Sequence, residues 1–165
     1  MIILVLGLPG SGKSYFAERL AKQLDAEYRN SDRLRRELFP KRTYSEQEKA
    51  MVYVMMFEKM EEALNQNSNL VLDATFHKKE TRHPFLAKGE GKISIIEVRA
   101  DEETIRQRVQ KNRPISEADF DVYQLIKQEW EPLDAPHLVL ESTNHNIDDM
   151  LQQAQEYLKN DPKSN

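Results

Sequence analysis

Eight residues near the start of the chain constrain its fold and chemistry most strongly. Residues 7–14 read GLPGSGKS, which places glycines, a lysine and a serine at the spacing of a phosphate-binding loop. The apolar run Ile2–Leu6 precedes the loop and predicts a buried strand, and the apolar stripe over Lys13–Leu24 predicts a helix after it. A strand, glycine-rich loop and helix in this order point successive backbone N–H groups at an anion. We therefore expect a polyphosphate site; the alternative is a glycine-rich turn that binds no ligand.

The loop side chains suggest particular roles in binding ATP and Mg²⁺, the two expected cofactors. Lys13 would reach the β- and γ-phosphates as a point charge, and the Ser14 hydroxyl would be a ligand of Mg²⁺. The ATP-binding residues expected in and next to the loop are Gly7, Pro9, Gly10, Ser11, Gly12, Lys13, Ser14 and Tyr15.

Composition limits the organisation of the chain and the partners it can bind. Its 165 residues predict a single domain over 1–165, and the lack of cysteine excludes disulfides, thiolate catalysis and cysteine-based zinc sites. No apolar run approaches membrane-spanning length, so we expect a cytoplasmic protein without a membrane partner. A net charge of −4 argues against general binding of long nucleic acid, which needs a broad basic face. The oligomeric state is left open.

Short β-like runs alternate with longer amphipathic ones along the rest of the chain. After the first strand, strands are predicted over 26–30, 69–73, 92–99 and 137–141. After the first helix, helices are predicted over 33–39, 45–67, 78–88, 102–112, 116–130 and 147–158. In the helix over 45–67, Ser45 and Glu48 form a capping box, and Tyr53, Phe57, Met60 and Leu64 form the main apolar stripe. Methionines 51, 55, 56 and 60 are expected to fill the core.

This alternation predicts an α/β fold with a five-stranded parallel sheet covered by helices on both faces. Together with the phosphate loop, the alternation predicts a three-layer P-loop NTPase fold, to which we expect a small arginine-bearing lid to belong. Ligands of such sheets bind at the carboxyl ends of the strands. The phosphate loop, Asp32, Asp73 and Arg99 all fall at that edge.

Asp73 ends the apolar run Leu70-Val71-Leu72, where a second acidic element accompanies a phosphate loop. A carboxylate there holds Mg²⁺ directly or through water. The alternative is a strand-end aspartate that caps the next turn.

Asp32 lies at the end of the second predicted strand, with Arg35 three positions further on. A helix N-cap would explain Asp32 alone, but not the arginines around it. Residues 29–42 hold six basic residues against two acidic ones, a local net charge of +4 in a protein of net charge −4. We expect this segment to face an anion; a solvated helix face is the alternative for any single arginine.

Two arginines seven residues apart, Arg106 and Arg113, share a helix face if the helix over 102–112 continues that far. Arg113 precedes Pro114 at the start of a predicted loop that could close over ATP. Phosphoryl transfer depends on cations aimed at the transferring group and on the exclusion of water. For Arg106, the alternative is a surface ion pair with Glu102 at i, i+4.

Over nearly its whole length the chain resembles the P-loop kinase family that includes the kinase domain of bacteriophage polynucleotide kinase. Zeta toxins and chloramphenicol phosphotransferase are more distant relatives. The resemblance rests on the phosphate loop, the lid arginines, and these residues: Asn30, Asp32, Arg35, Asp73 to Thr75, and Arg82.

The resemblance implies roles for individual residues. Asp32 would accept the proton of the substrate hydroxyl, and Arg35 would contact a substrate phosphate. Thr75 and Arg82 would also be substrate-binding residues. Arg108 and Arg113 would approach the ATP phosphates, although Arg106 competes with Arg108 because the spacing differs by one residue from that of the phage enzyme.

The sequence therefore predicts an ATP- and Mg²⁺-dependent kinase in which Lys13, Asp32 and Arg113 are catalytic and Ser14 and Asp73 hold the metal. The favoured acceptor is a nucleic-acid 5′-hydroxyl or a nucleotide-like molecule. A kinase for a small sugar or antibiotic is one alternative. The other is an ATP-controlled switch without phosphotransfer, against which the Asp32 to Arg35 element counts because a switch needs no acceptor base.

Overall fold

Five strands form one parallel sheet at the centre of the molecule. A computed structural model describes residues 1–111 and 117–161 of the chain. The strands are β1 (Ile2–Leu6), β2 (Glu27–Asn30), β3 (Leu70–Ala74), β4 (Ile93–Arg99) and β5 (Leu138–Glu141). They lie in the order β2-β3-β1-β4-β5, and each neighbouring pair is parallel. The predicted five-stranded parallel sheet is confirmed.

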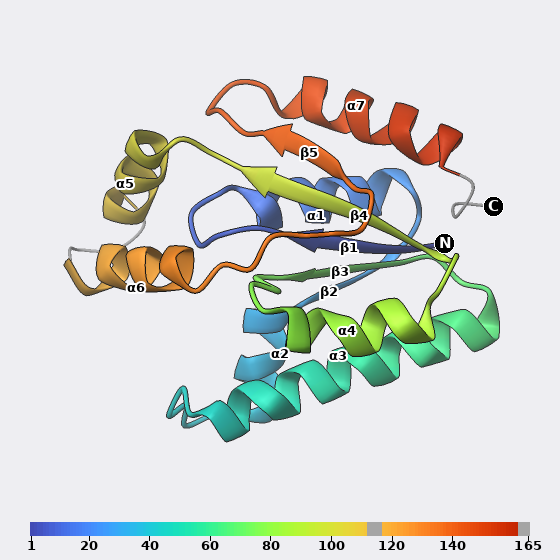
Figure 1. Cartoon of the computed structure of the whole chain (residues 1–165), viewed down its shortest axis with the longest axis horizontal. Helices are drawn as coiled ribbons and strands as arrows, with labels where there is room; N and C mark the ends of the chain where they lie inside the picture. Colours follow the sequence, from blue (N-terminus) through green and yellow to red (C-terminus); the bar gives the residue numbers. More distant parts are fainter. Residues whose placement is uncertain (112–116, 162–165) are drawn as a thin grey trace.

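Helices cover both faces of this sheet (Figure 1). They are α1 (Lys13–Gln23), α2 (Ser31–Leu38), α3 (Glu46–Gln66), α4 (Lys79–Lys88), α5 (Glu102–Lys111), α6 (Glu117–Gln128) and α7 (Ile147–Asn160). Helices α1 and α7 pack on one face, and α3 and α4 pack on the other. Helices α5 and α6 lie beyond the carboxyl ends of the strands, where the lid was predicted (Figure 1). The three-layer architecture is confirmed, and no described helix is long and apolar enough to cross a membrane.

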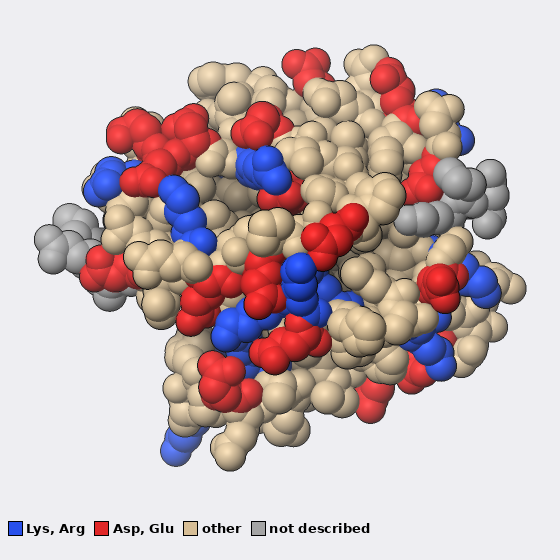
Figure 2. Space-filling view, viewed as in Figure 1, with Lys and Arg blue, Asp and Glu red and all other residues tan. Residues whose placement is uncertain are grey.

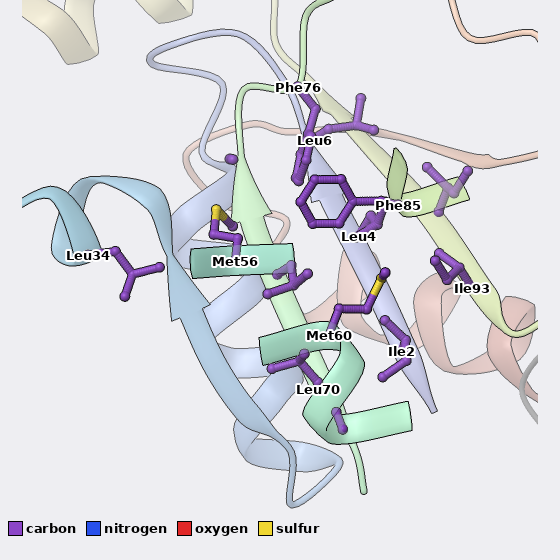
Figure 3. Close-up of a cluster of buried hydrophobic side chains, with 14 of the residues drawn as sticks. Ile2, Leu4, Leu6, Leu34, Met56, Met60, Leu70, Phe76, Phe85 and Ile93 are labelled. Carbon is purple, nitrogen blue, oxygen red and sulfur yellow. The ribbon is translucent and has the colours of Figure 1, made fainter. Parts of the chain in front are cut away.

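Successive side chains of β1 point to opposite sides of the sheet. Because helices cover both sides, the strand is buried on both of its faces. Ile2, Leu4 and Leu6 join the cluster under α3 and α4 that Figure 3 shows, and Ile3 and Val5 join the cluster under α1 and α7. The phosphate loop therefore starts from the central strand of the sheet, all of whose residues are buried.

The long helix α3 begins as predicted but buries a different stripe. The Ser45 hydroxyl accepts a hydrogen bond from the Glu48 backbone N–H at 3.2 Å, which confirms the N-cap. The fully buried apolar residues of α3 are Val52, Met56, Met60 and Ala63. The prediction of Tyr53, Phe57 and Leu64 as the main stripe was wrong, and these three are only partly buried. Met51 is 52% exposed and does not fill the core.

The aromatic rings of α3 explain this difference. The Tyr53 ring lies 5.3 Å from that of Phe76, and the Phe57 ring lies 5.5 Å from that of Phe85. The Phe57 ring thus packs between α3 and α4, and the Tyr53 ring packs on the segment that joins β3 to α4. Slimmer side chains of α3 lie closest to the sheet. The helix predicted over 116–130 is shorter than expected: α6 ends at Gln128, and Trp130 packs beyond the helix against the same core cluster.

Candidate active site

The phosphate loop passes too close to its surroundings to carry ordinary side chains at two glycines. A Cβ on Gly7 would collide with the Val98 carbonyl oxygen of β4 and lie 2.8 Å from the Ser11 hydroxyl. Gly12 is the N-cap of α1 and has a φ of 89°, the left-handed region that favours glycine. No side chain in the described part of the chain caps this helix end, so its first N–H groups are left for an anion.

A cavity of about 430 Å³ opens beside the loop and is large enough for a nucleotide. Its walls come from the loop and the start of α1, from α5, from the segment that joins β5 to α7, and from the first turn of α7. The lining residues are Gly10, Gly12, Lys13, Ser14, Tyr15, Arg108, Ser142, Thr143, Asn144, Ile147 and Met150. The sequence analysis missed the last five, although their place after the fifth predicted strand puts them at the binding edge of the sheet.

The remaining predicted ATP-binding residues of the loop do not line this cavity. Gly7 is buried at the end of β1, Pro9 is partly exposed, and Ser11 is buried. The Ser11 hydroxyl has no hydrogen-bond partner in the described part of the chain.

Arg108 lies directly over the phosphate loop. Its guanidinium donates to the Gly10 carbonyl oxygen at 3.2 Å, to the Ser142 hydroxyl at 3.1 Å and to the Asn144 side-chain oxygen at 3.1 Å. Burial lowers the pKa of Arg108, and the nearby Asp101 carboxylate opposes that shift. The group still carries its charge beside the loop, because a guanidinium does not deprotonate in proteins.

Arg106 turns away from the loop. It lies 3.9 Å from the Glu102 carboxylate and covers the Phe120 ring at 4.0 Å. This is the surface pairing given above as its alternative, so the geometry favours Arg108 over Arg106 at the phosphates. Arg113 lies outside the described residues.

Asp73 and Ser14 lie close together at the carboxyl edge of the sheet. Asp73 is fully buried, and its Oδ2 accepts hydrogen bonds from the Tyr28 hydroxyl at 2.7 Å and from Asn30 Nδ2 at 2.6 Å. Asn30 Nδ2 also lies 3.3 Å from the Ser14 hydroxyl. The other oxygen, Asp73 Oδ1, is buried without a hydrogen-bond partner in the described part of the chain.

An unpartnered buried carboxylate oxygen is costly unless a cation neutralises it. Mg²⁺ prefers oxygen ligands, and Asp73 Oδ1 with the Ser14 hydroxyl supplies two of them at the end of the phosphate loop. The residues present therefore fit Mg²⁺.

Tyr28 belongs to this group although the sequence analysis missed it. Burial, followed by the charge of Asp73, raises the pKa of Tyr28 well above its ordinary value, so the phenol stays protonated and donates. Residues 28 and 30 lie two apart on a strand and share one face, which is the sequence signal that could have identified Tyr28.

The N-cap of α2 is Asn30. Its side-chain oxygen accepts hydrogen bonds from the backbone N–H groups of Asp32 and Arg33, both at 3.0 Å. The alternative of Asp32 as the helix cap is therefore wrong. The Asp32 side chain is 69% exposed, and Arg35 Nη1 lies 4.0 Å from its Oδ1.

Arg35 lies under the loop that joins α2 to α3. Its guanidinium carbon lies 5.4 Å from the centre of the Tyr44 ring, and its Nε is buried with no hydrogen-bond partner among the described residues. Glu48 clamps the end of this loop: its carboxylate accepts from the Thr43 N–H at 2.7 Å, the Thr43 hydroxyl at 2.8 Å and the Tyr44 N–H at 2.8 Å.

Acidic neighbours neutralise part of the basic segment over residues 29–42. Arg29 pairs with Glu27 at 2.6 Å and Arg33 pairs with Glu18 at 3.0 Å, in addition to the longer Arg35–Asp32 pair. On the face that Figure 2 shows, lysines and arginines are interspersed with acidic residues. The exposed positive charge is thus smaller than the sequence count suggests.

Arg82 is buried and bonded to main-chain carbonyl groups. It is 3% exposed, and its guanidinium donates to the carbonyl oxygens of Phe76, His77, Glu131 and Pro132 at 2.8–3.4 Å. These bonds join the end of β3 to the segment after α6. Main-chain carbonyl groups thus engage both Nη atoms of Arg82, and its substrate-binding role stays a prediction. Thr75, by contrast, is partly exposed directly after β3.

Replacing Arg82 with methionine should lower the free energy of unfolding by about 3 kcal/mol, because buried carbonyl groups lose their charged donor. ATP affinity should stay unchanged. Urea unfolding and calorimetry measure the two quantities, and Lys88→Met, on the exposed side of the same helix, is the control. A stable variant with weakened acceptor binding would support the substrate role.

Comparisons with known proteins identify the family and the fold of the chain. A family model described as an AAA domain matches residues 2–133. No curated protein sequence matches the chain significantly.

Three solved structures share the fold over nearly the whole chain. A sugar kinase from a Janibacter species is 15% identical, with a TM-score of 0.74, and the match covers 99% of this chain and 96% of that one. The APS kinase of Mycobacterium tuberculosis, in complex with AMPPNP and APS, is 20% identical, with a TM-score of 0.74 and 96% of each chain covered. Chaetomium thermophilum Kti12, in complex with ADP-AlF3, is 17% identical, with a TM-score of 0.62, and the match covers 94% of this chain and 98% of that one.

At these identities the likeness shows a common fold, and the specific likeness to phage polynucleotide kinase stays a prediction. The family match, in contrast, extends over most of the chain and includes the phosphate loop, Asp32 and Asp73. The chain therefore belongs to the AAA domain family.

Proposed function

We propose that this protein is a kinase that transfers the γ-phosphoryl group of ATP to a hydroxyl of an acceptor molecule. The observation that carries the proposal is the unpartnered, buried Asp73 Oδ1 beside Ser14, at the end of a phosphate loop. An exposed carboxylate, Asp32, lies on the helix that begins one residue after Asn30. Of the three structural neighbours, two are kinases and two are in complex with nucleotide analogues, which supports the same reaction class.

The donor half of the site would bind ATP and Mg²⁺. The loop N–H groups and Lys13 would hold the β- and γ-phosphates, and the cavity beside them would take the nucleoside. Ser14 and Asp73 would hold Mg²⁺, which supplies positive charge to the phosphate oxygens. Arg108, and Arg113 by the resemblance, would add cations at the phosphates.

The acceptor half would be built on α2. Asp32 would take the proton of the acceptor hydroxyl while that oxygen bonds to the γ-phosphorus. The bond between the γ-phosphorus and the β–γ bridging oxygen breaks, and ADP leaves with the electron pair. Arg35 would bind an anionic group next to the reactive hydroxyl, and Thr75 lies at the same edge of the sheet.

The remaining charge around α2 favours an acceptor with one or two anionic groups over a long polyanion. Two of the six basic residues of segment 29–42 already have close acidic partners, and Arg35 has a more distant one. A nucleotide-like molecule or a nucleic-acid 5′ end satisfies this requirement. A sugar-like acceptor is the second candidate, and the fold shared with a sugar kinase supports it.

An acceptor screen with radiolabelled ATP tests the function. Oligonucleotides with 5′-hydroxyl ends, nucleoside 3′-phosphates and phosphate-free sugars would be compared, with the label followed into each product. We expect transfer to an acceptor that carries phosphate, and a shallow salt dependence of about −0.7 in logarithmic slope per contacted phosphate. Equal transfer to a phosphate-free sugar would favour the second candidate, and tight ATP binding without transfer to any acceptor would favour the switch.

Replacing Arg35 with alanine should raise the KM for a phosphate-bearing acceptor about 10- to 100-fold, since a charge-assisted hydrogen bond is lost. The KM for ATP should change little. Steady-state kinetics with each substrate varied in turn measure both values. Lys59→Ala removes a positive charge on α3 and controls for net charge; if both variants behave alike, Arg35 does not bind the acceptor.

A further inference from the structure

Tyr28 and Asn30 reach across from β2 to the same oxygen of Asp73. The hydroxyl of Tyr28 lies 2.7 Å, and Nδ2 of Asn30 2.6 Å, from Asp73 Oδ2. We propose that these two side chains are positioning residues for the metal site, which hold the Asp73 carboxylate so that Oδ1 is reserved for Mg²⁺. The inference rests on the nucleotide and metal binding proposed above and adds residues that do not touch the metal.

Asn30 uses its whole hydrogen-bonding capacity in this arrangement. An asparagine side chain has one carbonyl oxygen with two lone pairs and one amide group with two protons. The oxygen accepts from the N–H groups of Asp32 and Arg33, which fixes the orientation of the amide. The two amide protons are then directed at Asp73 Oδ2 and the Ser14 hydroxyl. Because a flipped amide would break the helix cap, the orientation of Asn30 is locked.

The hydrogen bond from Tyr28, added to that from Asn30, restricts the orientation of the Asp73 carboxylate. Two donors on Oδ2 and none on Oδ1, among the described residues, leave the carboxylate one preferred orientation. Register supports the same geometry, since Asn30 pairs with Asp73 across the β2–β3 ladder. Partners of metal ligands commonly fix ligand orientation, and their loss typically weakens metal affinity about 10- to 100-fold.

Asn30 also connects the two halves of the proposed site. Its oxygen caps α2, which carries Asp32 and Arg35, and its amide contacts Asp73 and Ser14, the expected metal ligands. One side chain therefore sets the distance between the metal site and the proposed acceptor base.

The test compares the affinity for ATP with Mg²⁺ and with EDTA by calorimetry, so that the ratio of the two dissociation constants isolates the contribution of the metal. Tyr28→Phe removes one donor, and Asn30→Ser removes the other while serine still caps α2. We expect each variant to reduce the ratio about 10-fold, and the double variant about 100-fold. Affinity for ATP in EDTA should stay at the wild-type value. Electron paramagnetic resonance of Mn²⁺ with ATP gives an independent reading of metal affinity.

Tyr157→Phe is the matched control, because it removes a phenol beside another aspartate, Asp161, which contacts Ser94 at the start of β4. It should leave the ratio unchanged. Thermal unfolding shows whether each variant folds. If Asn30→Ser does not fold, Tyr28→Phe alone provides the test.

Two results would overturn the inference: a wild-type ratio in folded Tyr28→Phe, or an equal loss of affinity with and without metal. A wild-type protein that binds ATP in a metal-dependent way but phosphorylates no acceptor would refute the proposed kinase activity and leave this inference standing.

Discussion

Lys13→Ala should lower kcat/KM for phosphoryl transfer by about 10³-fold or more, and it should weaken binding of ATP with Mg²⁺. Lys13 lies in the first turn of α1 and lines the cavity beside the phosphate loop. Without its ammonium group, the β- and γ-phosphates lose the one cation that the loop itself supplies. Cations at the transferring group account for a large part of the acceleration in this reaction class. Transfer of labelled phosphate measures turnover, and calorimetry measures ATP affinity.

Lys22→Ala is the matched control for this experiment. Lys22 lies in the last turn of the same helix and is exposed, so its loss removes the same charge far from the loop. Wild-type turnover in Lys22→Ala with loss in Lys13→Ala would assign the effect to the phosphate site. Unchanged turnover in Lys13→Ala would remove the loop from the mechanism.

Asp32→Asn should lower the rate of transfer by roughly 10²- to 10⁴-fold, because the substitution keeps the size of the side chain but removes the proton acceptor. ATP affinity should change little, since Asp32 is not among the residues that line the nucleotide cavity. The structure sharpens this test. Because Asn30 caps α2, the helix start does not depend on the Asp32 side chain, and loss of activity cannot be assigned to an uncapped helix.

Glu37→Gln removes a carboxylate from the exposed part of α2 and serves as the control for Asp32→Asn. It should retain wild-type kcat, with circular dichroism showing the same helix content in both variants. Full transfer activity in Asp32→Asn would assign the base to another group. ATP hydrolysis without an acceptor, measured in parallel, separates loss of transfer from loss of nucleotide turnover.

Much of the fold follows from local sequence signals, but the side of a helix that faces the core does not. Strands and helices occur where periodicity, caps and breakers predict them, mostly within one or two residues, because these signals act over a few neighbouring residues. In α3, Phe57 and Met56 are both apolar, and periodicity alone cannot tell which of them lies on the sheet. In the structure, Met56 is fully buried in the core, because the Phe57 ring packs instead against Phe85 on α4.

The candidate site was predictable where one motif contains it and not where distant segments meet. The phosphate loop is contiguous, so its residues could be named from the sequence. Tyr28 contacts an aspartate 45 positions away, and only the pairing of β2 with β3 brings the two together. Arg82 is another case in which distant segments meet. The family resemblance predicts that Arg82 binds substrate, and only the structure shows that it donates to the carbonyl oxygens of Phe76 and Glu131.

The Glu48 carboxylate anchors Thr43 and Tyr44 at the end of the α2–α3 loop. Insertions in this loop and insertions in the sheet therefore have different consequences for the fold. An inserted residue in β1 or β3 would shift a parallel ladder and turn every buried side chain beyond it to the opposite face. The α2–α3 loop is a surface connection, and its far end is anchored by a carboxylate that belongs to α3. A change in its length or composition can therefore leave the sheet and the phosphate loop intact. Under the proposed function, a change of acceptor would require exchange of a short surface segment and no change in the residues proposed to bind ATP.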